Sequence, residues 1–190
     1  MVEQVEERLA CAFTGHRPSR LGAVAQGGQK QRLLERIGQE VNRLYYEEGI
    51  RHYYTGMALG ADLWFAQKVL ELRRAKRDVK LHCVLPCYDQ ELSWEEEDRE
   101  VYRSILAQAD EAFYLNGAYF RGCMQERNRY LVERAATLLA VYDGEQGGGT
   151  AYTVRHARRL RRRIVVIDPR EEAAQQQLSA KGAPSPGSAR

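Results

Sequence analysis

The chain has 190 residues, 44% of them hydrophobic, which fits one domain with a full core and is too short for two ordinary domains. Its formal net charge of +3 is well below the excess of a dedicated duplex-DNA binder. No apolar run approaches the roughly 18 residues of a membrane span, and the acidic residues 1–8 do not resemble a signal peptide. We therefore expect a cytoplasmic protein without a membrane segment.

The four cysteines predict a reducing compartment. Cys11, Cys83, Cys87 and Cys123 form no C-x-x-C pair, and two of them lie in apolar, strand-like runs. A thiol in such a run behaves as a small hydrophobic group. We expect reduced cysteines and no metal site.

Short apolar runs alternate with amphipathic stretches along the chain, and Gly49 is expected to end the first long helix. The predicted strands are residues 9–14, 51–55, 79–85, 111–115, 137–142 and 164–167. The predicted helices are residues 29–48, 62–74, 100–109, 125–136 and 150–163. Six strands separated by helices indicate an α/β fold, with a parallel sheet and helices on both of its faces.

One domain and a tail are predicted. Residues 1–168 hold all the expected strands and helices. After Pro169 the chain is rich in Gln, Ser, Ala, Gly and Pro, with few large apolar groups. We expect residues 169–190 to be disordered.

The carboxyl ends of the strands are the expected place for a ligand, because open parallel sheets bind ligands there, at the switch point of strand order. The loops at that edge are residues 15–18, 56–62, 86–88 and 143–150. Three of them carry glycine, and two run straight into a helix whose N-terminus offers free N–H groups to phosphate. The pattern predicts a nucleotide-like ligand, although the last glycine cluster taken alone also fits a flexible turn.

Four segments in this order resemble the YpsA family of bacterial proteins: residues 14–18, 56–62, 127–129 and 148–150. The resemblance covers about residues 9–168. That family belongs to the SLOG superfamily of Rossmann-like proteins, which includes the DNA-processing protein DprA and the Lonely Guy phosphoribohydrolases. The resemblance implies a Rossmann-like fold and a nucleotide or nucleotide-derived ligand.

The two relatives imply different activities. The glycine turn 56–62 and the Arg-Asn-Arg run 127–129 are similar to segments of DprA. Met124 with Arg127, followed by Gly149-Thr150, resembles motifs of the Lonely Guy enzymes. In those enzymes a catalytic glutamate follows three residues after the threonine, where this chain has Thr153.

A phosphoribohydrolase would therefore need a different catalytic carboxylate. Gln146 also stands where the Lonely Guy motif has its first glycine. The candidates for the missing acid or base are Asp143 and Glu145, on the turn beside the expected phosphate site. Whether the protein is an enzyme stays open.

The candidate ligand-binding residues lie on the four loops and at the start of the helix before the fifth strand. They are Gly15, His16, Arg17, Gly56, Met57, Ala58, Gly60, Asp62, Pro86, Tyr88, Arg127, Asn128, Asp143, Gly144, Gly147, Gly148, Gly149 and Thr150.

Several of these side chains have an alternative structural role. Arg17 can hold phosphate or pair with a carboxylate, and Asp62 can accept a ribose hydroxyl or stabilise a helix start. Arg127 and Arg129 point to different sides of a helix, and Arg127 is predicted to face the ligand. Among the aromatic residues near the loops, Tyr88 is predicted to stack on a base.

Two runs of charge remain. The acidic run 95–98 with Glu100 is expected to begin a helix, where carboxylates favour the dipole. Six arginines between residues 155 and 163 are expected to end the last helix, and their number also suits an anionic partner, RNA, DNA or an acidic protein. That partner would bind through Arg155, Arg158, Arg159 and Arg162.

Three functions follow from the sequence. The leading hypothesis is a domain that binds or senses a nucleotide or a nucleotide-derived ligand. The second is a hydrolase of an N-glycosidic bond, and the third is a binder of single-stranded nucleic acid in the manner of DprA. The identity of the ligand, any further cofactor and assembly as a homo-oligomer stay open.

Overall fold

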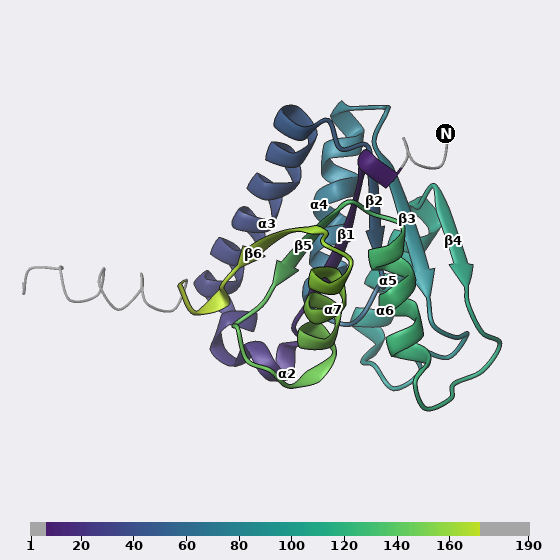
Figure 1. Cartoon of the computed structure of the whole chain (residues 1–190). Coiled ribbons are helices and arrows are strands. Elements are labelled where there is room, and N and C mark those ends of the chain that lie inside the picture. Colours follow the sequence, from purple (N-terminus) through teal and green to yellow (C-terminus); the bar gives the residue numbers. More distant parts are fainter. Residues whose placement is uncertain (1–6, 172–190) are drawn as a thin grey trace, which may run out of the picture.

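The computed structural model of the protein describes residues 7–171 and has a six-stranded sheet at its centre (Figure 1). The order of the strands is β4-β3-β2-β1-β5-β6, and every neighbouring pair is parallel. The strands are β1 Ala10–Gly15, β2 His52–Thr55, β3 Lys80–Leu85, β4 Glu111–Tyr114, β5 Thr137–Val141 and β6 Arg163–Ile167.

Helices cover both faces of the sheet. From β1 to β4 the chain moves stepwise toward one edge with α3, α4 and α5 on one face, and it then returns through α6 and α7 on the other. This change of face is what right-handed crossovers require when the direction of travel reverses. The predicted Rossmann-like α/β fold is confirmed. The helices are α2 Pro18–Leu21, the 3₁₀-helix η1 Gly22–Ala25, α3 Gly27–Glu48, α4 Ala61–Ala75, α5 Glu96–Gln108, α6 Cys123–Glu133 and α7 Gly148–Arg159.

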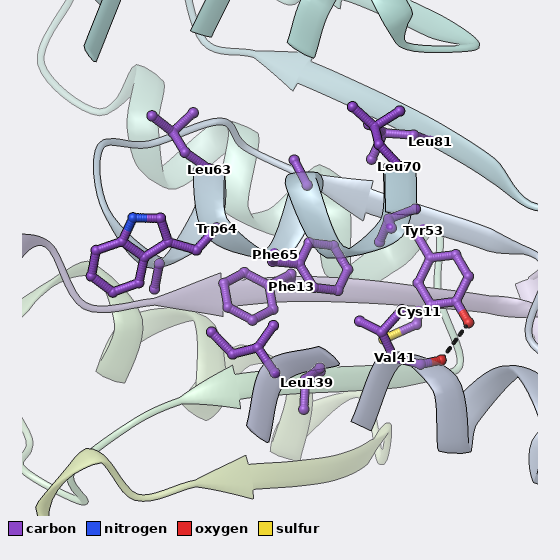
Figure 2. Close-up of a cluster of buried hydrophobic side chains, with 14 of the residues drawn as sticks. Cys11, Phe13, Val41, Tyr53, Leu63, Trp64, Phe65, Leu70, Leu81 and Leu139 are labelled. Carbon is purple, nitrogen blue, oxygen red and sulfur yellow. Dashed lines mark hydrogen bonds between the residues drawn. The ribbon is translucent and has the colours of Figure 1, made fainter. Parts of the chain in front are cut away.

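Alternate residues of the central strands lie in two separate cores. In β1, Cys11 and Phe13 face α3 and α4, whereas Ala10 and Ala12 face α6 and α7. Figure 2 shows the larger core, where the ring of Phe13 stacks on Phe65 with 4.3 Å between centroids. The Tyr53 hydroxyl, buried in the same core, donates a 3.0 Å hydrogen bond to a main-chain carbonyl of α3. The central strands β1 and β5 are therefore fixed in register by burial on both faces.

The ends of the helices differ from the prediction where local signals compete. Gly49 terminates α3 in the left-handed conformation with φ 72°, as expected. The loop after β1 contains two short helices that were not predicted, the first begun by Pro18 at its N-terminus. α5 begins at Glu96, earlier than the predicted helix 100–109. The expectation that the acidic run begins a helix is confirmed, because its carboxylates form the first turn, where they favour the dipole.

The expectation that the arginine run ends the last helix is wrong for its second half. α7 ends at Arg159, and Arg161 has a left-handed backbone with φ 55°. Arg162 donates to the carbonyls at the end of α6 and pairs with Glu7, and Arg163 is the first residue of β6. The chain turns here because residue 163 must pair with Thr137 of the central sheet.

The remaining expectations concern the tail, the membrane and the cysteines. Residues 169–171 are helical, and the rest of the predicted disordered tail lies outside the described residues. Within residues 7–171, no helix combines the length and the apolar character that a membrane crossing requires. All four cysteines are buried and unpaired.

Candidate functional site

A cavity of about 370 Å³ lies at the carboxyl edge of the sheet, where the loops after β1, β2 and β5 meet the first turns of α6. β1 and β5 are neighbours, and the helices that follow them lie on opposite faces of the sheet. The cavity is thus at the switch point of strand order, where open α/β sheets bind ligands. Two of the segments that border it, α2 and the turn before α7, lie at the bottom of the view in Figure 1. Its lining residues are Thr14, Gly15, His16, Arg17, Ser19, Arg20, Ala58, Asp62, Met124, Gln125, Arg127, Asn128, Gly147, Gly148, Gly149 and Thr150.

The first turn of α7 forms one wall of this cavity. No side chain caps the helix at Gly147, and the first N–H groups of a helix have no partner within it. Gly148 has φ 86°, a conformation that glycine adopts at little cost. A Cβ atom at Gly147 or Gly148 would meet nothing within 4 Å. The helix N-terminus is therefore open, with its positive dipole end directed at the cavity.

Two side chains hold this open turn from behind. Thr153, which is fully buried, donates from Oγ1 to the Gly149 carbonyl at 2.8 Å. Arg155 donates to the Gln146 carbonyl at 2.7 Å. The carbonyls of Gln146 and Gly149 thus have hydrogen-bond partners within the protein.

A buried cation and a buried carboxylate form the opposite wall. Arg127 of α6 is only 4% exposed and donates to the Gly56 carbonyl and, from Nε at 2.8 Å, to Asn128. Burial lowers the pKa of Arg127, and Asp62 partly offsets that effect. Burial raises the pKa of Asp62 to about 6, against the opposing effects of Arg127 and of hydrogen bonds from the N–H groups of Ala58 and Gly15.

The turn after β2 is closed by packing. A Cβ atom at Gly56 would collide with the guanidinium of Arg127. Gly60, with φ 98°, would place a Cβ atom 2.6 Å from Cδ of Pro18. A Cβ atom at Gly15 would lie 2.5 Å from that of Ala61. These glycines allow the loops after β1 and β2 to pack against α4 and α6.

A polar network joins the loop after β1 to the turn after β5. The main-chain N–H of Asp143 donates to Nε2 of His16 at 3.3 Å, and the Asp143 carboxylate lies 3.0 Å from the same nitrogen. The carboxylate accepts from Nε of Arg20 at 2.9 Å, and Arg20 also pairs with Glu145 at 2.7 Å. Burial lowers the pKa of His16 despite the neighbouring carboxylate. Burial acts to raise the pKa of Asp143, but Arg20, the Glu145 N–H and His16 outweigh it and lower that pKa to about 2.

The structure brings most of the candidate ligand-binding residues together at the cavity. Those that line it are Gly15, His16, Arg17, Ala58, Asp62, Arg127, Asn128, Gly147, Gly148, Gly149 and Thr150. Arg129, on the other side of α6, donates instead to the hydroxyl of Tyr152 on the surface.

The other candidates lie outside the cavity lining. Met57 is fully buried, with its main chain bonded to Thr55 and Gln90. Tyr88 is exposed and packs on Tyr114, 4.2 Å between centroids. The remaining candidates outside the lining are Gly56, Gly60, Pro86, Asp143 and Gly144.

Sequence reasoning did not include five lining residues among its candidates. Thr14, Ser19 and Arg20 belong to the end of β1 and to α2, and Met124 and Gln125 to the first turn of α6. Two signals were present in the sequence. Proline is common at the first position of a helix, so Pro18 indicates a short helix that would contain Arg20. Met124 lies three residues before Arg127 and hence on the same side of α6.

The fold and the cavity define a class, the Rossmann-like α/β proteins whose site lies at a glycine-bearing strand edge. Within that class the chain belongs to the YpsA family, described as the YspA SLOG family, whose model matches residues 11–169. It is 32% identical over 148 residues to a UPF0398 protein of Bacillus pumilus, covering 77% of this chain and 80% of that protein. It is 28% identical over 152 residues to the UPF0398 protein YpsA of Bacillus subtilis, covering 79% and 84%.

Two solved structures of DNA processing protein A have a similar fold. The Helicobacter pylori protein, reported with a single-stranded DNA binding mode, aligns with a TM-score of 0.58 at 14% identity, over 93% of this chain and 76% of that one. The Streptococcus pneumoniae protein aligns with a TM-score of 0.56 at 14% identity, over 92% and 56%. At this identity the likeness concerns the fold.

Proposed function

We propose that the protein binds or senses a nucleotide or a nucleotide-derived ligand, holding its phosphate in the cavity at the carboxyl edge of the sheet. One observation carries the proposal: the uncapped N-terminus of α7 and the guanidinium of Arg127 line the same cavity. Free N–H groups, a helix dipole and a fixed cation are the groups that recognise phosphate. Membership of the family and the DprA-like fold fit such a role.

The other lining groups suit the rest of such a ligand. Arg17 lines the same cavity and supplies a second cation, while Asp62 offers a carboxyl group to a sugar hydroxyl. A volume of about 370 Å³ lies within the usual range of small-molecule sites. We assign the phosphate to residues 147–150 and to Arg127, and the sugar to the side of Asp62.

A hydrolase of the N-glycosidic bond is the second candidate, and Asp62 is the observation that favours it. A carboxyl group with a pKa of about 6 in the cavity can exchange a proton near neutral pH. Asp143 is less suited to that task, because its pKa of about 2 keeps it ionised and His16 and Arg20 occupy its oxygens. Thr153 is turned away and bonds to Gly149.

Binding is tested with the intact chain, first by mass spectrometry of small molecules released from the purified protein and then by thermal shift against nucleotides and nucleotide sugars. A ligand at 100 times its Kd should add about 2.7 kcal/mol of stability. Gly147→Leu should fold normally and lose this shift, because its side chain enters open space at the phosphate position. Gly28→Leu, in the first turn of α3 and outside the cavity lining, is the matched control. No shift with any ligand, or an equal shift in both variants, contradicts the proposal.

Catalysis is tested separately by following release of free base from nucleoside monophosphates. A hydrolase should release base in an Asp62-dependent manner, with Asp62→Asn inactive and Asp143→Asn active. Tight binding without release supports the binding function alone.

A further inference from the structure

A concentrated run of positive charge lies at the amino ends of the strands, opposite the carboxyl ends that border the cavity. Residues 73–80 hold five cations and one carboxylate. The run starts in the last turn of α4 and ends at the first residue of β3. Because all the strands are parallel, the start of β3 and the carboxyl ends that border the cavity lie at opposite edges. In Figure 1 this edge is at the top of the view.

Part of the run is held rigidly by Asp110. Its carboxylate accepts from Arg73 at 2.7 Å, from Lys80 at 3.0 Å and from the Leu81 N–H at 3.0 Å. The pKa of Asp110 is lowered, because the hydrogen bonds from Leu81, Arg73 and Lys80 outweigh the opposing effect of burial. Asp110 thus positions Arg73 and Lys80.

Two further cations of the run lie close to Arg73 and Lys80. Arg74 and Arg77 are exposed, and within residues 7–171 neither has a carboxylate partner. With Arg73, Lys80 and Asp110 they line a hollow of about 380 Å³. Four cations face one carboxylate there. Arg73 and Arg74 lie in the last turn of α4, where cations interact favourably with the helix dipole. Arg77 and Lys80 follow the helix, so the dipole does not explain why cations are present there.

An exposed aromatic ring lies beside Lys76 of the basic run. Tyr46, near the end of α3, is 63% exposed, and Nζ of Lys76 lies 5.1 Å from the centre of its ring. Tyr45 packs edge-on against Tyr46, and the guanidinium of Arg51 lies over the ring of Tyr45 at 4.1 Å. Arg51 in turn pairs with Asp78 of the basic run at 2.7 Å. Tyr45 and Lys76 thus contact the ring of Tyr46, and most of the Tyr46 side chain is accessible to solvent.

We propose that residues 73–80 and Tyr46 bind single-stranded nucleic acid, with backbone phosphates in the basic hollow and a base stacked on Tyr46. A positively charged groove combined with an exposed aromatic ring is the usual means of binding single strands without sequence preference. Duplex DNA keeps its bases stacked inside and cannot use the ring, and anionic lipid or an acidic protein would need only the charge. The surface is separate from the nucleotide cavity and does not depend on it.

The test uses the full chain and a fluorescently labelled oligothymidylate, followed by anisotropy at several salt concentrations. The double variant Arg74→Glu/Arg77→Glu should weaken binding at least about tenfold and lower the salt slope by roughly one to two units. Tyr46→Ala should weaken it by roughly fivefold to a hundredfold, the range found for one stacked base. The variant Arg158→Glu/Arg159→Glu makes the same change in net charge at the end of α7, the other surface that the sequence offers to an anionic partner. If residues 73–80 carry the binding, this variant should bind within about twofold of the wild type.

Three results would overturn the proposal. The first is no binding by the wild-type chain, or binding that survives Arg74→Glu/Arg77→Glu. The second is an equal or greater loss in the Arg158→Glu/Arg159→Glu control, which would mean that net charge or α7 carries the binding. The third is Tyr46-independent binding shared with duplex DNA or with vesicles of phosphatidylglycerol, which would identify a general polyanion surface.

Discussion

The two glycine turns that border the cavity look alike in sequence and behave in opposite ways. In the turn after β2, a side chain on Gly56 or Gly60 would collide with Arg127 or Pro18. In the turn after β5, a side chain on Gly147 or Gly148 would extend into open space. The first turn uses glycine to let chain segments pack closely, whereas the second leaves room for something outside the chain. A glycine-rich turn therefore indicates a ligand only when the space beside it is open.

The largest expected effect is on the closed turn. Gly60→Ala should destabilise the protein by about 4 kcal/mol, because the new Cβ atom meets the rigid ring of Pro18 while the backbone is held at φ 98°. Urea denaturation measures the change. The open turn supplies the control, since Gly147→Ala should stay within about 0.5 kcal/mol of the wild type. Equal losses in the two variants would remove the distinction between the turns.

The carboxylate of the closed turn should make stability fall as the pH rises. The folded-state pKa of Asp62, about 6, lies above 3.8, the ordinary pKa of an aspartate, so the folded protein holds this proton more tightly than the unfolded chain. The stabilisation is complete below about pH 4 and is lost as the pH rises through 6, a change of up to about 3 kcal/mol. Urea denaturation between pH 4 and 7 should show a flatter profile for Asp62→Asn. An unchanged slope would show that Asp62 does not titrate in this range.

The carboxylate of the open turn should have the opposite pH dependence. The pKa of Asp143 is lowered from 3.8 to about 2, so its stabilisation is present above about pH 4 and is lost as the pH falls toward 2. With allowance for partial exposure to solvent, about 1 to 2 kcal/mol is involved. Thermal unfolding of Asp143→Asn should show a smaller loss of stability on acidification than the wild type. Arg20→Gln removes the main partner of this carboxylate and should reproduce part of that effect.

The smallest effect on stability, with a large effect on function, is expected at Gly148. Gly148→Ala should cost about 1 kcal/mol, because φ is 86° there and the space is otherwise open. Gly148→Leu should cost a similar amount and abolish binding of the phosphate-bearing ligand found by thermal shift. Calorimetric titration of that ligand measures the loss. A folded Gly148→Leu variant with wild-type affinity would place the phosphate elsewhere.

The fold was predictable because its signals are local. Short apolar runs such as 137–142 alternate with amphipathic stretches, and Gly49 ends a helix through its own backbone conformation. The switch-point rule predicted that the loops after β1, β2 and β5 meet at the carboxyl ends of the strands, and residues of all three line one cavity, whereas the predicted loop 86–88 does not. Position along the chain and side-chain type were sufficient for these features.

What was missed depends on contacts between residues far apart in the sequence. Arg20 donates to Asp143, 123 residues later in the chain, and Arg162 donates to Glu7 and to the end of α6, so neither role can be read from neighbouring residues. Tyr88 follows a strand as the rule requires, yet it packs on Tyr114 beside the edge strand rather than at the switch point. The order of the strands, which decides all three cases, has no local signal in the sequence.

The position of β1 between β2 and β5 has a consequence for how the protein folds during synthesis. β2 follows β1 after one helix, but β5 is made only after most of the chain has left the ribosome. Until then one edge of the most central strand has no partner, and half of the cavity wall is missing. Closing such a long loop is slow, and unpaired edges favour aggregation. We therefore expect chains truncated before residue 137 to aggregate, and the ligand site to be among the last parts of the molecule to form.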